Sequence, residues 1–259
     1  MKIIAAALIA TFAAAPALAA DSAGLSLPPG FHATIVADGL GAGARHIAVR
    51  SNGDIYIATR PGRRNPTHTG IIAIKLGPDH KAAQIEHFSS IDGGTGLRLY
   101  KGALYAASKD ALYRFTFKGN ELVPSAAPEV IVADLPTAGH TNYGFAFDGK
   151  GGLYLSVGGK GNICTDPDTP KGERPVGLKP CPDLSGRAGV WRFDAEKTNQ
   201  KFPTDGTQIA TGVRDMMAVD WSKDLNGFYG VMQDRNGTSR TFRNVVSPKE
   251  EDSARQAAS

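Results

Sequence analysis

The sequence is poor in cysteine and tryptophan, with two residues of each among its 259. It has no Cys-x-x-Cys-His motif, which excludes a covalently attached c-type haem. Beyond the first 20 residues, no segment is apolar over the roughly 20 residues that a membrane-spanning helix needs. The net charge of +4 is spread along the chain, without a basic stripe interleaved with aromatic residues. A membrane span and nucleic-acid binding are therefore not expected.

The start of the chain has the composition of a secretory signal peptide. Lys2 precedes an apolar stretch from Ile3 to Ala15, and residues 16–19 supply a small-x-small cleavage site. We expect residues 1–20 to be the signal peptide, with cleavage after Ala19 or Ala20. The mature protein is then exported, to the periplasm if the source is Gram-negative.

The two cysteines, Cys164 and Cys181, lie in one segment rich in proline and glycine. In an oxidising compartment we expect them to form a disulfide that closes this segment into a loop. Metal ligation is the alternative, although two thiols without a nearby histidine fall short of the usual zinc ligand set.

A short phrase, Gly-Asp-Ile-Tyr-Ile-Ala at residues 53–58, recurs along the chain. Similar phrases begin at Gly102 and Gly151, so both steps are 49 residues. A fourth copy begins at Asn226, 75 residues after Gly151, and the segment from 161 to 187 can hold the 26 extra residues. Self-similarity at this period indicates an array of identical small folding units.

Each unit is expected to contain four strands, because three further apolar runs accompany the phrase. The runs before the phrase are residues 47–49, 97–99, 145–147 and 218–221. The runs after it are residues 71–74, 112–115 and 190–193. The runs expected to open each unit are residues 34–37, 85–88, 130–133 and 208–211.

Four strands per repeat of this length are typical of a β-propeller blade. We therefore predict an all-β fold, with a propeller of about four blades over residues 27–233 and an irregular polar tail over residues 234–259. The alternative, a β-sandwich, also has short, evenly spaced strands but does not repeat one phrase in phase.

Two loops precede strands at the same phase of the repeat and are therefore expected at one end of the ring. The first contains His140 and the second contains Arg214 and Asp215. A histidine there can accept a proton near neutral pH, and an arginine supplies a fixed positive charge. The alternatives are that His140 bonds to the backbone of its own turn and that Arg214 forms a surface ion pair. A basic run, Arg60 with residues 63 and 64, is either a solvated loop or a pocket for an anion.

These features resemble a known family. The sequence Leu-Pro-Pro-Gly-Phe at residues 27–31 is similar to the opening of the soluble glucose/sorbosone dehydrogenases, six-bladed propellers that use pyrroloquinoline quinone. Residues 140–162, from His140 to Asn162, are similar to the family's catalytic-histidine segment. Gly-Val-Arg-Asp at residues 212–215 is similar to its Gly-x-Arg-Asn loop, in which the arginine contacts the quinone.

The resemblance implies that His140 is the general base and that Arg214 and Asp215 belong to the cofactor site. The substrate would be a sugar or sugar aldehyde such as sorbosone, with hydride passing to the quinone and calcium polarising the quinone carbonyl. Electrons would leave to a separate acceptor. Asp215 replaces the usual asparagine, and Gly159 stands where many relatives carry aspartate.

After Gln233 the blade pattern stops, whereas family members continue with two more blades that carry the calcium ligands. No calcium ligand can therefore be assigned, and we expect either a truncated or frameshifted relative or a ring closed with four blades. Two other functions remain open. The chain could be a non-catalytic propeller that binds a partner at its loop end, or a propeller hydrolase of the lactonase type.

Overall fold

The structure, a computed structural model, describes residues 23–40, 43–60, 70–89, 91, 93–166, 168–170 and 176–237. The predicted signal peptide, residues 63 and 64 of the basic run, and the tail after residue 237 lie outside the described residues. Arg60 is described, and its backbone N–H donates to the carbonyl of Gly43 at 2.9 Å. Among the described residues, no helix has the length and apolar character that crossing a bilayer requires.

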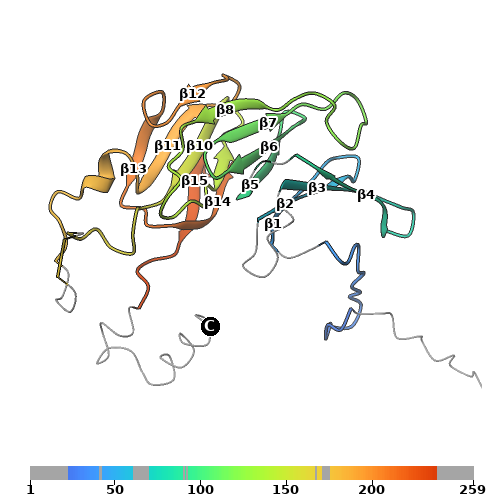
Figure 1. Ribbon diagram of the computed structural model, residues 1–259. Coiled ribbons are helices and arrows are strands. Elements are labelled where there is room, and N and C mark those ends of the chain that lie inside the picture. Colours follow the sequence, from blue (N-terminus) through green and yellow to red (C-terminus); the bar gives the residue numbers. More distant parts are fainter. Residues whose placement is uncertain are drawn as a thin grey trace, which may run out of the picture.

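The described chain folds into three large sheets and one hairpin, in sequence order (Figure 1). The first sheet consists of β1 (Ala44–Val49), β2 (Ile55–Thr59), β3 (Gly70–Leu76) and β4 (Ala82–Phe88). The second consists of β5 (Gly93–Tyr100), β6 (Ala103–Ser108), β7 (Leu112–Phe115) and β8 (Glu129–Ala133), with β12 (Gln200–Lys201) added at its edge. The third consists of β9 (Phe145–Phe147), β10 (Gly152–Val157), β11 (Gly189–Asp194) and β13 (Thr207–Thr211). The hairpin consists of β14 (Met216–Ser222) and β15 (Gly227–Met232).

The first strands of successive units, β1, β5, β9 and β14, are neighbours in that order. Within each large sheet, the consecutive strands from one blade pair antiparallel. This is the all-β propeller arrangement that the repeat predicts: three complete blades and the first two strands of a fourth. The repeated phrase forms the second strand of every unit, namely β2, β6, β10 and β15.

One part of the strand prediction is wrong. The runs expected to open each unit instead close the preceding one, because β4 pairs with β3, β8 with β7 and β13 with β11. For β4 the short turn at residues 77–81 makes β3 the nearest antiparallel partner, whereas the connections that lead into β8 and β13 are longer. Residues 34–37 form no strand. The Ala82 N–H donates to the Val36 carbonyl, and Val36 and Ala37 pack against the apolar cluster of the first sheet.

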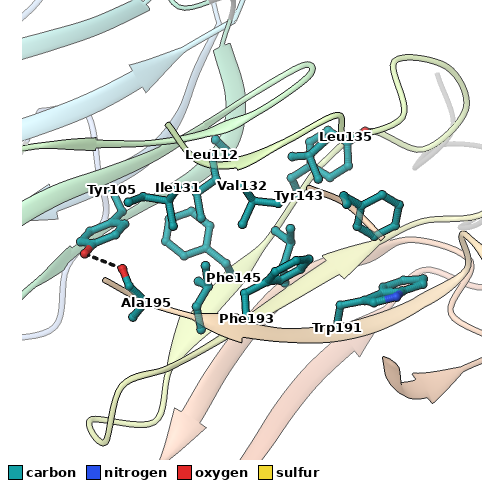
Figure 2. Close-up of a cluster of buried hydrophobic side chains, with 14 of the residues drawn as sticks. Tyr105, Leu112, Ile131, Val132, Leu135, Tyr143, Phe145, Trp191, Phe193 and Ala195 are labelled. Atoms are coloured by element: carbon teal, nitrogen blue, oxygen red, sulfur yellow. Dashed lines mark hydrogen bonds between the residues drawn. The ribbon is translucent and has the colours of Figure 1, made fainter. Parts of the chain in front are cut away.

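The core lies between successive sheets. Leu104 and Ala106 of β6 face the cluster shared with the first sheet, whereas Tyr105 and Ala107 face the cluster shared with the third. Figure 2 shows this second cluster, in which Phe145 of β9 lies among side chains from the second and third sheets. Both faces of a central strand are therefore buried, which the alternation of side chains along a strand allows.

Between the third sheet and the hairpin the packing is aromatic. The ring of Tyr154 on β10 lies 4.8 Å from Trp221 and 5.9 Å from Phe228. The far face and edge of the hairpin are solvent-exposed within the described structure, with Tyr229 51% and Val231 67% exposed.

Replacing Phe145 with alanine tests the core between the second and third sheets. Because Phe145 is 1% exposed, Phe145→Ala is expected to lower the free energy of unfolding by about 3–5 kcal/mol, measured by urea denaturation. Phe31→Ala is the matched control, since Phe31 is 68% exposed. The core assignment is contradicted if both variants lose stability equally.

Candidate functional site

The candidate site is built from three connections at one end of the third sheet. Residues 136–142 lead into β9 and carry His140, residues 158–160 follow β10, and residues 212–215 join β13 to β14 and carry Arg214. Gly159 touches both of the other connections. Its carbonyl accepts the backbone N–H of His140 at 3.1 Å, and its own N–H donates to the carbonyl of Arg214 at 2.8 Å. The structure therefore brings the two predicted loops together.

The imidazole of His140 is half-buried and oriented by the same glycine. Nδ1 of His140 lies 2.9 Å from the carbonyl oxygen of Gly159. Because a carbonyl oxygen can only accept, Nδ1 carries the hydrogen in this contact and Nε2 of the neutral ring is left as an acceptor. The alternative that His140 bonds within its own turn is wrong for this nitrogen, since its partner is 19 residues away.

The guanidinium of Arg214 is held by neutral acceptors. Its Nε donates to Oδ1 of Asn162 at 3.2 Å, and one terminal nitrogen donates to the carbonyl of Gln233 at 3.3 Å. Oδ1 of Asn162 also accepts the backbone N–H of Asn236 at 2.7 Å. Because these described partners carry no charge, the positive charge of Arg214 is not neutralised by them.

Asp215 joins the two loops a second time. Its side chain is buried, and the amide of Asn142 donates to Oδ1 at 2.9 Å and to Oδ2 at 3.0 Å. The carboxylate therefore faces the His140 loop. Whether Asp215 also contacts a cofactor, as the sequence predicts, stays a prediction.

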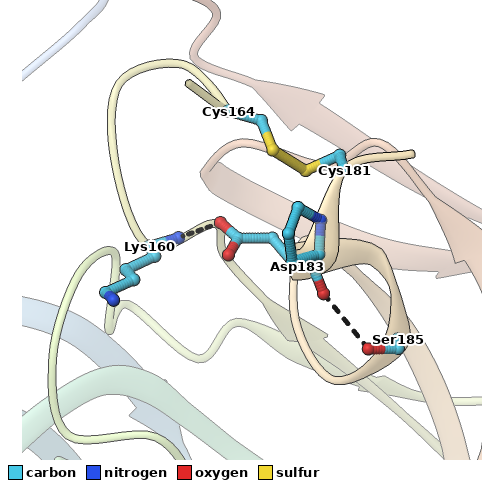
Figure 3. The surroundings of a disulfide bond; sticks show 6 residues. Lys160, Cys164, Cys181, Asp183 and Ser185 are labelled. Atoms are coloured by element: carbon cyan, nitrogen blue, oxygen red, sulfur yellow. Dashed lines mark hydrogen bonds between the residues drawn. A yellow bond between two sulfur atoms is a disulfide. The ribbon is translucent and has the colours of Figure 1, made fainter. Parts of the chain in front are cut away.

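A cavity of about 260 Å³ lies beside Arg214. One wall is the disulfide between Cys164 and Cys181, which confirms the pairing predicted from the sequence (Figure 3). Apolar side chains of Ile163, Leu184 and Val213 line the cavity as well. The loop beyond the disulfide is tied to the site, because Oδ2 of Asp183 accepts the backbone N–H of Lys160 at 2.9 Å.

Tyr143 connects the His140 loop to the core. It is 1% exposed, and its hydroxyl donates to the carbonyl of Pro136, which closes the loop behind His140. Its φ of 38° lies in the left-handed region, which bulky residues adopt rarely and mostly where the surroundings enforce it. Burial raises the pKa of Tyr143 to about 12.

The described residues do not supply a carboxylate cluster for calcium. Across the described ranges, no group of three or more His, Cys, Asp or Glu side chains is placed to hold a metal ion. No step in the proposed chemistry is therefore routed through calcium.

Sequence reasoning missed the parts of the site that act through the backbone. Gly159 hydrogen-bonds to both loops, Gly158 lies close against them, and Arg187 donates from Nε to the carbonyl of Gly158 at 3.3 Å. The adjacent glycines at the end of a strand were the available signal, since such glycines often mark a close backbone approach. Nothing in the pattern identifies Arg187.

The packed sheets and loop-end site define the chain as a β-propeller protein. A family model described as TrAA12-like matches residues 25–252. The chain belongs to the TrAA12-like family, which confirms at the family level the resemblance seen in the sequence. A comparison with curated proteins found no match.

Solved structures share the fold at low identity. The holo form of the pyranose dehydrogenase PQQ domain from Coprinopsis cinerea has 16% identity and a TM-score of 0.58, covering 78% of this chain and 48% of that chain. The calcium structure of a Trichoderma reesei carbohydrate-active enzyme of family AA12 has 17% identity and a TM-score of 0.60, covering 78% of this chain and 50% of that chain. This chain therefore spans about half the length of these structures.

The buried Tyr143 hydroxyl predicts a loss of stability at alkaline pH. Because its folded-state pKa of about 12 exceeds the unfolded value of about 10, the stabilisation is complete below about pH 10 and is lost as the pH rises towards 12. Tyr143→Phe is expected to flatten the dependence of the urea midpoint on pH across this window. Tyr229→Phe, at an exposed position, should keep the parent's slope; a Tyr143→Phe slope equal to the parent's contradicts the assignment.

The disulfide predicts a measurable contribution to stability. The cysteines are 17 residues apart, and closing a loop of that length stabilises the fold by about 3 kcal/mol on the chain-entropy model. The double variant Cys164→Ser/Cys181→Ser is expected to have a free energy of unfolding lower by about 3 kcal/mol. Its urea midpoint should therefore be lower than the parent's. Reducing agent should lower the parent to the same midpoint and leave the variant unchanged; an unaffected parent would contradict the disulfide's role.

Proposed function

We propose that this protein is a quinoprotein dehydrogenase of sugars or sugar aldehydes, with His140 as general base and Arg214 as a contact of pyrroloquinoline quinone. The observation that carries the proposal is the orientation of His140, whose Nδ1 is engaged by Gly159 and whose Nε2 is left to accept a proton. Membership in the TrAA12-like family and the quinone domain among the similar folds support it.

The residues beside the cavity fit part of an anionic cofactor. Arg214 borders the cavity and has neutral partners, so its charge is available to a carboxylate. The cavity, at about 260 Å³, is slightly smaller than the roughly 300–1,000 Å³ that is typical of small-molecule sites. Pyrroloquinoline quinone carries three carboxylates, and among the described residues only Arg214 is proposed as a cation for one of them.

The proposed reaction is a two-electron oxidation. When bound, pyrroloquinoline quinone supplies the hydride acceptor. The proton of an anomeric or hydrated-aldehyde hydroxyl passes to Nε2 of His140 as the carbon-bound hydrogen leaves with its electron pair. An aldose is thereby oxidised to a lactone, or an aldehyde hydrate to an acid, and the two electrons then pass to a separate acceptor.

The environment we propose for this reaction is outside the cytoplasm. The composition of residues 1–20 predicts export, and the Cys164–Cys181 disulfide fits an oxidising compartment. The Gram-negative periplasm satisfies both.

Two substitutions test the base and the cofactor contact. In protein reconstituted with pyrroloquinoline quinone and calcium, dye reduction by aldoses or sorbosone is expected to fall by about 10²–10⁴-fold in His140→Ala, because a positioned base contributes that much. Arg214→Gln is expected to raise the quinone concentration needed for half-saturation by roughly tenfold, through loss of one charged contact.

The controls are exposed residues of the same types. His32→Ala and Arg192→Gln, which lie at solvent-exposed positions, should match the parent. A His140→Ala variant as active as the parent would reject the base. A parent that shows no quinone uptake in an absorbance titration, but saturable binding of a protein ligand, would favour the non-catalytic propeller instead.

A further inference from the structure

The backbone of Gly158 and Gly159 lies between the two loops that carry the proposed base and cofactor contact. Gly159 accepts from both the backbone and the Nδ1 of His140, and donates to the carbonyl of Arg214. We propose that these two glycines are positioning residues, which hold His140 in one tautomer and fix it relative to Arg214. This inference rests on the proposed function.

Gly158 is placed where a side chain cannot fit. A Cβ built at this position would lie 2.5 Å from the Cβ of His140 and 2.7 Å from the carbonyl oxygen of Arg214. Both contacts are far below van der Waals distance. Neither obstacle is the end of a flexible side chain, because one is a Cβ and the other is backbone. Any larger residue must therefore push the His140 and Arg214 loops apart.

Gly159 differs from its neighbour in this respect. A Cβ there would lie 3.8 Å from its nearest atoms, in Ala188, Arg214 and Asp183, which is ordinary contact. Its φ lies outside the left-handed region that disfavours other residues. What Gly159 contributes to the site is its carbonyl and N–H, which alanine would also supply. Because Gly159 itself lines the cavity, the matched substitution of one methyl group is Gly186→Ala, outside the site, where an added Cβ would meet nothing within 4 Å.

Holding the carbonyl against Nδ1 has a chemical consequence. With the hydrogen on Nδ1, the unprotonated Nε2 is the proton acceptor in every neutral molecule. If the carbonyl moves away, the hydrogen exchanges between the two nitrogens and part of the population presents an Nε2–H that cannot accept. The N–H of Gly159 donates to the carbonyl of Arg214 and so fixes the position of the Arg214 loop relative to His140. Displacements of about 1 Å can cost on the order of 10²-fold in rate.

The tautomer is measured directly by ¹⁵N-detected multiple-bond NMR of the imidazoles, with the His140 signals identified by their loss in His140→Gln. The parent and Gly186→Ala are expected to show the Nδ1–H tautomer of His140. Gly158→Ala is expected to show mixed tautomers. An Nε2–H tautomer in the parent overturns the proposal.

Kinetics supply the second readout. Gly158→Ala is expected to lower kcat on the order of 10²-fold with KM nearly unchanged, and Gly186→Ala to stay within about two-fold of the parent. Equal effects of the two variants on tautomer and kcat overturn the proposal. If Gly158→Ala fails to fold, Arg187→Met replaces it, because Arg187 donates to the Gly158 carbonyl and its loss loosens the same segment. An Arg187→Met variant with an unchanged tautomer and rate then counts against the proposal.

The dehydrogenase function and the positioning of His140 by the two glycines can be rejected separately. The NMR measurement needs neither quinone nor substrate, so an inactive parent with the Nδ1–H tautomer would reject the proposed function and leave the positioning intact. An active parent with the Nε2–H tautomer would do the reverse.

Discussion

The constraint on which the rest of the structure depends is that successive sheets bury their facing surfaces against one another. A lone sheet of four short strands has too little core, so each blade is stabilised by its neighbours. The second strand of the second sheet shows the pattern, with Leu104 packed towards the first sheet and Tyr105 towards the third. Since the loops of successive blades are spaced by this packing, the sheets set the distance between the His140 and Arg214 turns.

Much of the fold could be predicted from the sequence because each copy of the repeated phrase corresponds to one blade. The phrase beginning at Gly53 predicted the second strand of each unit, and the runs on either side of it predicted the first and third. The phase of the fourth strand was wrong, because a run such as residues 85–88 lies between two units and its apolar pattern does not state which neighbour it pairs with. That choice is made by the length and geometry of the turn at residues 77–81.

The site was predictable where side chains carry the chemistry and not where the backbone does. The loops with His140 and Arg214 stood out by residue type and phase, and the structure brings both against Gly159. The glycine itself was interpreted from sequence as a missing carboxylate. In the fold, its carbonyl supplies the acceptor that Nδ1 of His140 needs. A backbone contact between residues 19 apart leaves no mark on composition or spacing.

The short strand β12 has a consequence for how the molecule comes apart. It belongs in sequence to the connection between β11 and β13, yet it pairs in parallel with β8 of the second sheet. The buried amide of Gln200 in this strand donates to the carbonyls of Ile131, Asp194 and Lys197. β12, which comes from the third blade, is thus an edge strand of the second blade's sheet. The two blades cannot separate without breaking the hydrogen bonds between β12 and β8. The shared strand therefore joins the second and third blades into one cooperative unit.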